Sequence, residues 1–493
     1  MLENYFKNFR KNIIGMDQVF ETPFGPQKIL YADWTASGRL YAPIEKRLRE
    51  DIAPFVGNTH TETTVTGSTM TLAYHKALRI IKEHVGAGEE DVIISSNSGM
   101  TGVVNKFQRI LGLKVHEKFI ELIRNSMEEP PILFCTHMEH HSNQTSWLET
   151  LAEVEVIQAD EKGLVDLNHL EHLLKKYQNR KVKIAAVTSC SNVTGIRTPY
   201  RKIAEMMHRN GGLCFVDFAC SAPYIRINMH PENEGQYLDA IYFSPHKFLG
   251  GPGSSGILVF NSKLYNNKIP DNPGGGTVDW TNPWGGHKYV DEIEAREDGG
   301  TPAFLQTMKA GLCIKLKEEM GVENMLQREE EMLKILWQGL ESIPNFHILA
   351  GHVKDRLGVI SFYIDGLHYN LAVKLLNDRY GIQVRGGCSC AGTYGHYLLH
   401  VSKQFSKTIT DQINQGDLSS KPGWVRLSIH PTMTDEEMHF IINALRELSQ
   451  HHPDWGNDYS YNIHANEFHF NGEIYTDKQR VIEWFENGLV DAR

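Results

Sequence analysis

The chain has 493 residues, of which 41% are hydrophobic and 22% charged, proportions that suit a globular protein of two or three domains. Its 50 basic and 60 acidic residues give a net charge of −10, which argues against a nucleic-acid-binding surface. No apolar run reaches the ~18 residues of a membrane span, and the first residues contain no signal-peptide core, so no membrane partner is expected.

The middle of the chain alternates two kinds of segment. Short, continuous apolar runs of the kind found in buried strands are separated by amphipathic stretches with helical periodicity. Strands are predicted at residues 30–34, 91–96, 131–136, 154–157, 184–188, 213–217 and 241–243, and helices at residues 70–80, 103–111, 167–177 and 200–209. This alternation predicts an α/β fold with a mainly parallel sheet covered by helices on both faces. Ligands of such sheets bind beyond the carboxyl ends of the strands.

The pattern changes after about residue 318. A long helical run at residues 321–343 leads to a strand at 359–364, which predicts a second, smaller α+β region. The insert 266–298, rich in glycine, proline and tryptophan, is expected to be an ordered loop near the site. We predict an N-terminal segment associated with the small domain (residues 1–35) and a large domain (36–317). A small C-terminal α+β domain (318–450) and a C-terminal extension (451–493) follow.

A lysine and an aspartate lie at the ends of two predicted strands. Lys247 lies between an apolar strand and the glycine run 250–253, and Asp217 ends the strand at 213–217. Together they suit pyridoxal phosphate, because a lysine amine condenses with the cofactor aldehyde and a carboxylate keeps the pyridine nitrogen protonated. For either residue alone, an exposed loop lysine or a solvated aspartate would be the favoured reading. The pair predicts a cofactor site.

A predicted strand-to-helix junction suits the cofactor's phosphate group. Residues 98–102 read Ser-Gly-Met-Thr-Gly, and the helix that follows offers free backbone N–H groups and the positive end of its dipole. The alternative reading of Gly99 and Thr101 is an ordinary turn between a strand and a helix.

Three further segments complete a set of motifs. Residues 138–143 read Met-Glu-His-His-Ser-Asn, residues 189–195 read Ser-Cys-Ser-Asn-Val-Thr-Gly, and residues 423–428 read Gly-Trp-Val-Arg-Leu-Ser. In this order, the motifs resemble the class V aminotransferase family of fold-type I pyridoxal-phosphate enzymes, and within it the cysteine desulfurases and selenocysteine lyases. The resemblance covers roughly residues 30–444. It implies a large domain with a mainly parallel, seven-stranded type of sheet flanked by helices, and a smaller α+β C-terminal domain.

The resemblance also implies roles for individual residues. His140 would stack on the pyridine ring and relay protons, and Asn192 would contact the ring's phenolic oxygen. The residues expected to bind the cofactor are Gly99, Thr101, His140, Asn192, Asp217, Cys220, Ser244, His246, Lys247 and Thr301. Met100 stands where close relatives usually carry threonine. Cys220 stands where they carry a glutamine that hydrogen-bonds near the cofactor, and a thiol does not donate as an amide does.

Taken alone, these residues also have purely structural readings. His140 reads as a hydrogen-bonded loop histidine, Asn192 as a turn residue before a glycine, and Arg426 as a surface strand arginine. A metal pair of His140 and His141 is disfavoured, because adjacent residues do not share a face of a strand or a helix. We expect no metal site.

Two segments bear on the substrate and on assembly. Arg426 matches the family arginine that binds the substrate α-carboxylate, a role that suits a planar guanidinium with paired donors. Residues 299–302, Gly-Gly-Thr-Pro, resemble the segment that reaches across a dimer interface in the family, where Thr301 would approach the neighbour's phosphate group. The resemblance therefore implies a small amino-acid substrate and a homodimer with composite active sites.

The cysteines bear on both location and chemistry. Seven of them, an odd number and scattered apart from Cys388 and Cys390, predict reduced thiols in a cytoplasm. Residues 384–391, Val-Arg-Gly-Gly-Cys-Ser-Cys-Ala, resemble the desulfurase segment that carries the nucleophile, and Cys390 falls at that position. Its thiolate would attack the sulfur of a substrate cysteine. Cys388 is an additional thiol that would resolve the persulfide, form a disulfide with Cys390 or have no role.

The predicted function is that of a cysteine desulfurase, in which Lys247, His140 and Cys390 convert L-cysteine to L-alanine and an enzyme persulfide. An aminotransferase, an epimerase or another lyase of the family is the alternative, because the fold and the lysine are shared by all of them. A non-catalytic scaffold of the same fold is a third reading, against which the intact set of motifs argues. An acceptor protein for the sulfur would dock on the C-terminal extension.

Overall fold

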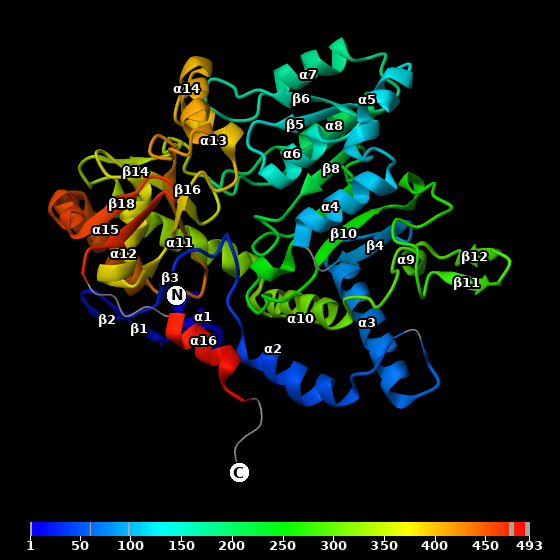
Figure 1. Cartoon of the computed structure of the whole chain (residues 1–493), viewed down its shortest axis with the longest axis horizontal. Helices are drawn as coiled ribbons and strands as arrows, with labels where there is room; N and C mark the ends of the chain where they lie inside the picture. Colours follow the sequence, from blue (N-terminus) through cyan, green and yellow to red (C-terminus); the bar gives the residue numbers. More distant parts are fainter. Residues whose placement is uncertain (1, 60, 97–98, 473–477, 489–493) are drawn as a thin grey trace.

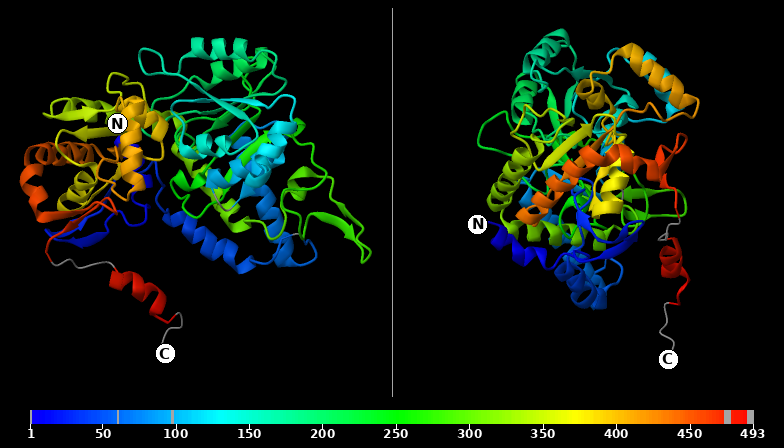
Figure 2. Two further views of the ribbon diagram at one scale, coloured as in Figure 1. Left: turned by 45° about the horizontal axis from the view of Figure 1, so that its top comes forward. Right: turned by 90° about the vertical axis from the view of Figure 1, so that its left-hand side faces the viewer.

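The computed structural model describes residues 2–59, 61–96, 99–472 and 478–488 (Figure 1). Residue 98 of the predicted phosphate-site segment and residue 97 before it lie outside the described residues, as do residues 473–477 and 489–493 of the predicted extension. Two sheet regions lie side by side in Figure 1 and in the left view of Figure 2. The domain boundaries at residues 35, 317 and 450 remain predictions.

The larger region is built on a seven-stranded sheet with the strand order β4-β10-β9-β8-β7-β5-β6. Its strands are β4 (Asp91–Ser96), β5 (Ile132–Thr136), β6 (Glu153–Ile157), β7 (Lys183–Thr188), β8 (Leu213–Asp217), β9 (Ala240–Phe243) and β10 (Gly256–Asn261). The strands from β9 to β6 pair in parallel, which confirms the mainly parallel sheet. β10, absent from the predicted set, is antiparallel to both of its neighbours.

Helices cover both faces of this sheet, as predicted. The helices of the larger region are α2 (Ala42–Arg47), α3 (Val65–His84), α4 (Gly99–Ile110), α5 (Glu117–Ser126), α6 (His141–Leu148), α7 (Leu167–Lys176), α8 (Tyr200–Arg209), α9 (Ile293–Arg296) and α10 (Phe304–Met320), with short π or 3-10 turns at Leu48–Ile52, Ala53–Phe55, Pro245–Lys247 and Ser262–Leu264. Successive residues of one strand pack into different hydrophobic clusters, because the side chains of a strand alternate between the two faces of the sheet. In β10, Leu258 and Phe260 belong to one apolar cluster, whereas Ile257 and Val259 belong to the other.

The smaller region contains a four-stranded antiparallel sheet with the order β13-β14-β17-β16. Its strands are β13 (Phe346–Ile348), β14 (Val359–Ile364), β16 (Arg385–Gly387) and β17 (Trp424–Ser428), and its helices are α11 (Val322–Leu340), α12 (Tyr369–Tyr380), α13 (Gly392–Leu398), α14 (Lys403–Asn414) and α15 (Asp435–Trp455). Helices α10 and α11 are separated only by Gly321, whose φ of +75° allows the abrupt change of direction between the two regions. The predicted smaller α+β region is thus present.

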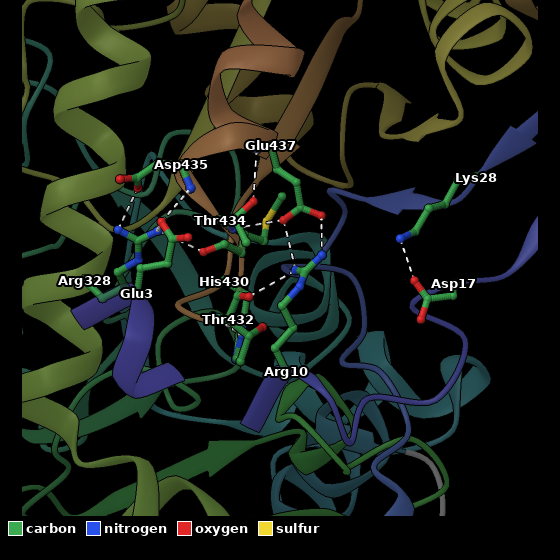
Figure 3. Close-up of polar contacts among 11 residues, drawn as sticks. Glu3, Arg10, Asp17, Lys28, Arg328, His430, Thr432, Thr434, Asp435 and Glu437 are labelled. Atoms are coloured by element: carbon green, nitrogen blue, oxygen red, sulfur yellow. Dashed lines mark hydrogen bonds and ion pairs between the residues drawn. The ribbon is translucent and has the colours of Figure 1, made fainter. Parts of the chain in front are cut away.

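The N-terminal segment packs on this smaller region. Its elements are α1 (Leu2–Arg10), β1 (Val19–Thr22), β2 (Gly25–Lys28) and β3 (Leu30–Tyr31), and β3 pairs in parallel with β15 (Ile382–Gln383). Figure 3 shows the polar contacts: both oxygens of Glu437 accept bonds from Arg10 at 2.6 and 2.9 Å. Glu437 also completes a capping box with Thr434 at the start of α15. The same carboxylate therefore starts a helix and ties the N-terminus to it.

Two further hairpins are present, one in the insert and one near the C-terminus. The insert 266–298 folds as β11 (Val278–Thr281) and β12 (His287–Tyr289), which project away from the smaller region in Figure 1 and in the left view of Figure 2. Bonds from Arg109 to both oxygens of Asp271, at 2.7 and 2.9 Å, anchor the insert to α4.

The C-terminal elements are a 3-10 turn (Gly456–Asp458), β18 (Tyr459–Asn462), β19 (Glu467–Phe470) and α16 (Lys478–Glu486). Among the described helices, none combines the length and apolarity that crossing a membrane requires.

Candidate active site

A cavity of about 240 Å³ lies where the carboxyl ends of β7, β8 and β9 face the loop after β16. Ten of the predicted site residues line it: Thr101, His140, Asn192, Asp217, Cys220, Ser244, His246, Lys247, Cys390 and Arg426. Gly99 lies at its edge, where an added Cβ would meet the hydroxyl of Ser244 at 3.3 Å. Thr301 is exposed and does not line the cavity, and its predicted role involves a second copy of the chain, so that role remains a prediction.

Lys247 and Asp217 form the chemical centre of the cavity. Burial lowers the pKa of Lys247, and the charges of Cys220 and Asp217 oppose that effect. A lowered pKa favours the neutral amine, which is the form that attacks an aldehyde. Burial raises the pKa of Asp217 to about 6, although the Ala219 N–H, 2.7 Å from Oδ1, and Lys247 both favour its charged form. At neutral pH the carboxylate is therefore a buried negative charge that suits a protonated ring nitrogen.

The start of α4 forms a polar cradle beside this centre. The Met100 N–H donates to the hydroxyl of Ser244 at 2.7 Å, and the hydroxyls of Thr101 and Ser142 share a hydrogen bond of 2.7 Å. Gly99 has a φ of +62°, a conformation that side-chain-bearing residues rarely adopt. Burial and Lys247 lower the pKa of His246 to about 4, so that it is neutral here. Hydroxyls, a neutral imidazole and a helix N-terminus suit a phosphate group.

His140 is held in a single orientation by its neighbours. It caps α6, and its Nδ1 accepts a bond from the Ser142 N–H at 3.1 Å, which places the proton of the neutral ring on Nε2. Burial, Lys247 and nearby positive groups lower its pKa to about 3. The preceding Glu139, whose role the motif reading missed, is buried and accepts the backbone N–H groups of Thr136 and Thr188 at 3.1 and 2.9 Å. These bonds connect Glu139 to the ends of β5 and β7, and so hold the loop that carries His140.

Cys390 lies on an exposed loop that closes one side of the cavity. Ser389 and Cys390 have φ values of +52° and +56°, a left-handed conformation that marks a strained turn. The loop is tied to the larger region at two points: the His141 N–H donates to the Cys390 carbonyl at 2.7 Å, and the Asn192 amide donates to the Ser389 carbonyl at 2.7 Å. Cys388 is half-buried and packs against the core, so the two thiols have different surroundings.

Arg426 is buried and belongs to an ion-pair network that the motifs did not reveal. Arg426 and Arg385 are directly opposite each other on β17 and β16, an arrangement that alone would be repulsive. Asp33, which follows β3, lies between them: one oxygen is 2.7 Å from Nη2 of Arg426 and the other 3.0 Å from Nε of Arg385. Arg385 also lines the cavity, so the site offers two guanidinium groups to an anionic substrate.

Replacing Arg426 by lysine is expected to raise the KM for an amino acid about tenfold to a hundredfold, because a hydrogen bond to a charged group is worth roughly 1.5–3 kcal/mol. Lysine keeps the charge but loses the planar fork. Steady-state kinetics of the variant and of Arg385→Lys measure the effect, and an unchanged KM in Arg426→Lys would assign Arg426 to holding Asp33 alone.

The cavity fits pyridoxal phosphate on three observations of this structure. Asp217 supplies a buried carboxylate, and the start of α4 supplies a cradle for an anion. The third is Asn192 Oδ1, which is buried and has no hydrogen-bond partner within the described part of the chain, as expected of a polar atom kept for a ligand.

Comparisons with known proteins agree with this geometry. The family model described as Aminotransferase class-V matches residues 30–440. A probable cysteine desulfurase of Synechocystis sp. is 29% identical over 274 residues, 54% of this chain and 62% of that protein. Another, of Halalkalibacterium halodurans, is 26% identical over 368 residues, 74% of this chain and 84% of that protein. The apo structure of a cysteine desulfurase from Thermococcus onnurineus superposes with a TM-score of 0.70 at 22% identity, over 90% of this chain and 98% of that one.

Proposed function

The chain belongs to the class-V aminotransferase family of pyridoxal-phosphate-dependent enzymes, and we propose that it is a cysteine desulfurase that binds this cofactor. It takes the sulfur of L-cysteine onto Cys390 and releases L-alanine. The observation that carries the proposal is an exposed thiol, Cys390, in the wall of the cavity that also contains Lys247 and Asp217. The names of the two relatives support the same activity.

Each residue of the site has its own role in the proposed reaction. Bound pyridoxal phosphate supplies an electron sink for bonds broken at the substrate's Cα. Asp217 would hold a proton on the ring nitrogen, and Lys247, whose lowered pKa favours the neutral amine, would hold the cofactor and move the α-proton. Arg426 and Arg385 hold the substrate carboxylate.

Sulfur transfer is the step that Cys390 performs. Its thiolate forms an S–S bond to the substrate sulfur while the substrate's Cβ–S bond breaks and leaves its electron pair on the carbon side. A proton from the site completes the methyl group of alanine. In total, one cysteine and one enzyme thiol give one alanine and one enzyme persulfide, so atoms and electrons balance.

The proposal extends to location and assembly. We propose a cytoplasmic enzyme, because its seven cysteines are all free in this structure and a sulfur-accepting thiol needs a reducing environment. We also propose a homodimer in which Thr301 completes the neighbour's phosphate site, and an acceptor protein that collects the sulfur from the exposed Cys390.

The test is product analysis with the cofactor-loaded protein. Incubation with L-cysteine and a thiol reductant should release alanine and sulfide in equal amounts, measured by amino-acid analysis and sulfide assay. The control replaces L-cysteine by L-serine, which lacks the sulfur and should yield no alanine. Formation of a keto acid without sulfide, on L-cysteine or on another amino acid, would replace the proposal by transamination.

A further inference from the structure

Two buried thiols lie side by side at the floor of the cavity. Cys190 follows β7 and Cys220 follows β8, two parallel strands that are paired up to Thr188 and Asp217. Both S–H groups donate to one acceptor, the carbonyl oxygen of Ser191, which is 3.6 Å from the Cys190 sulfur and 3.7 Å from the Cys220 sulfur, and each thiol affects the pKa of the other. Both line the cavity, although only 1% of Cys190 and 5% of Cys220 is exposed.

The two thiols differ in their ionisation. Burial, and after it the neighbouring Cys220, raise the pKa of Cys190. The neighbouring Cys190 and the positive charges of Lys247 and Arg426 lower the pKa of Cys220, against the effect of its own burial. Burial raises the pKa of three other buried cysteines, Cys135, Cys214 and Cys313, and none of them lines this cavity. A thiol of lowered pKa next to a second thiol is the arrangement that disulfide formation uses.

We propose that Cys190 and Cys220 form an oxidisable pair whose disulfide prevents tight cofactor binding, and that the bound cofactor in turn protects the pair. The oxidant is a small peroxide, because only a small molecule can enter a cavity of about 240 Å³. The Cys220 thiolate attacks one peroxide oxygen, and the O–O bond breaks to release hydroxide. The Cys190 sulfur then displaces the bound oxygen as water and forms the S–S bond. Two thiols and one hydrogen peroxide thus give one disulfide and two waters.

The disulfide acts on the cofactor site through its neighbours. Cys220 follows Ala219, whose N–H orients the Asp217 carboxylate at 2.7 Å. A covalent bond at the Cys220 sulfur shifts this turn and removes the group whose charge raises the pKa of Lys247. A displaced turn beside Asp217 and a changed charge near Lys247 are expected to weaken cofactor binding to the oxidised protein, by about tenfold for a coupling of ordinary size.

The experiment uses the full chain with Cys388→Ser and Cys390→Ser, which removes the exposed thiols. Cofactor-free protein treated with stoichiometric hydrogen peroxide should yield a peptide crosslink between Cys190 and Cys220, found by mass spectrometry without reduction. Pyridoxal phosphate added beforehand should suppress the crosslink. Titration followed by visible absorbance should show about tenfold weaker cofactor binding after oxidation, restored by a thiol reductant and insensitive to oxidation in Cys190→Ser.

This inference rests on the proposed function for its cofactor, and the outcomes distinguish the failure of the one from the failure of the other. Absence of the crosslink, equal crosslinking with and without cofactor, or equal cofactor affinity before and after oxidation each overturns the inference while leaving the desulfurase proposal in place. A crosslink in a protein that binds no pyridoxal phosphate in either state overturns the proposed function and the control of cofactor binding together.

Discussion

Alanine in place of Lys247 is expected to abolish covalent attachment of the cofactor and to slow alanine release by about 10²–10⁴-fold, the usual contribution of a positioned acid–base group. The loss has two causes. No other amine lines the cavity among the described residues, and the α-proton has lost the group that moves it. Borohydride reduction, proteolysis and mass spectrometry locate the attached cofactor, and amino-acid analysis measures the rate.

A second buried lysine provides the matched control. Burial lowers the pKa of Lys317 to about 7, but its Nζ donates to the Ala222 carbonyl at 2.7 Å and it lies outside the cavity. If a lowered pKa alone decided reactivity, the cofactor would also label Lys317. We expect the label only on Lys247. Label retained in Lys247→Ala would assign the attachment to another residue and contradict the site.

Serine in place of Cys390 is expected to stop alanine and sulfide release from L-cysteine while leaving cofactor absorbance intact. A hydroxyl does not accept the substrate sulfur, so the Cβ–S bond has no attacking group. The loop should keep its position, because the hydrogen bond from the His141 N–H is accepted by the backbone carbonyl of residue 390, which serine retains. Product analysis and the absorbance spectrum measure the two effects.

Cys388→Ser is the matched control for this variant. Cys388 lies two residues away on the same loop, is half-buried against the core and does not line the cavity. We expect it to retain alanine release. Equal loss in both variants would mean that the thiols act together, and full activity of Cys390→Ser would leave Cys390 as a structural residue and favour another reaction of the family.

Much of the fold was predictable because its signals are local. The continuous apolar run that contains Phe215 and Val216 identifies a strand buried on both faces, and Asp217 ends it. Since parallel strands present their carboxyl ends at one edge, the polar residues after β7, β8 and β9 had to meet there. Strand β10 was missed although residues 257–260 form an apolar run, and its antiparallel direction is a property that an apolar run does not record.

The sequence alone thus determined the α/β class, and it predicted a site at the carboxyl edge of the sheet with Lys247 and Asp217, which both line the cavity there. Only the tertiary structure decided which side chains act on one another across the chain. Asp33 joins two arginines more than 350 residues away in sequence, at Arg385 and Arg426. Cys190 and Cys220 become a pair through the register of β7 and β8. Local patterns report how each segment is buried, whereas such pairs arise only when distant segments pack together.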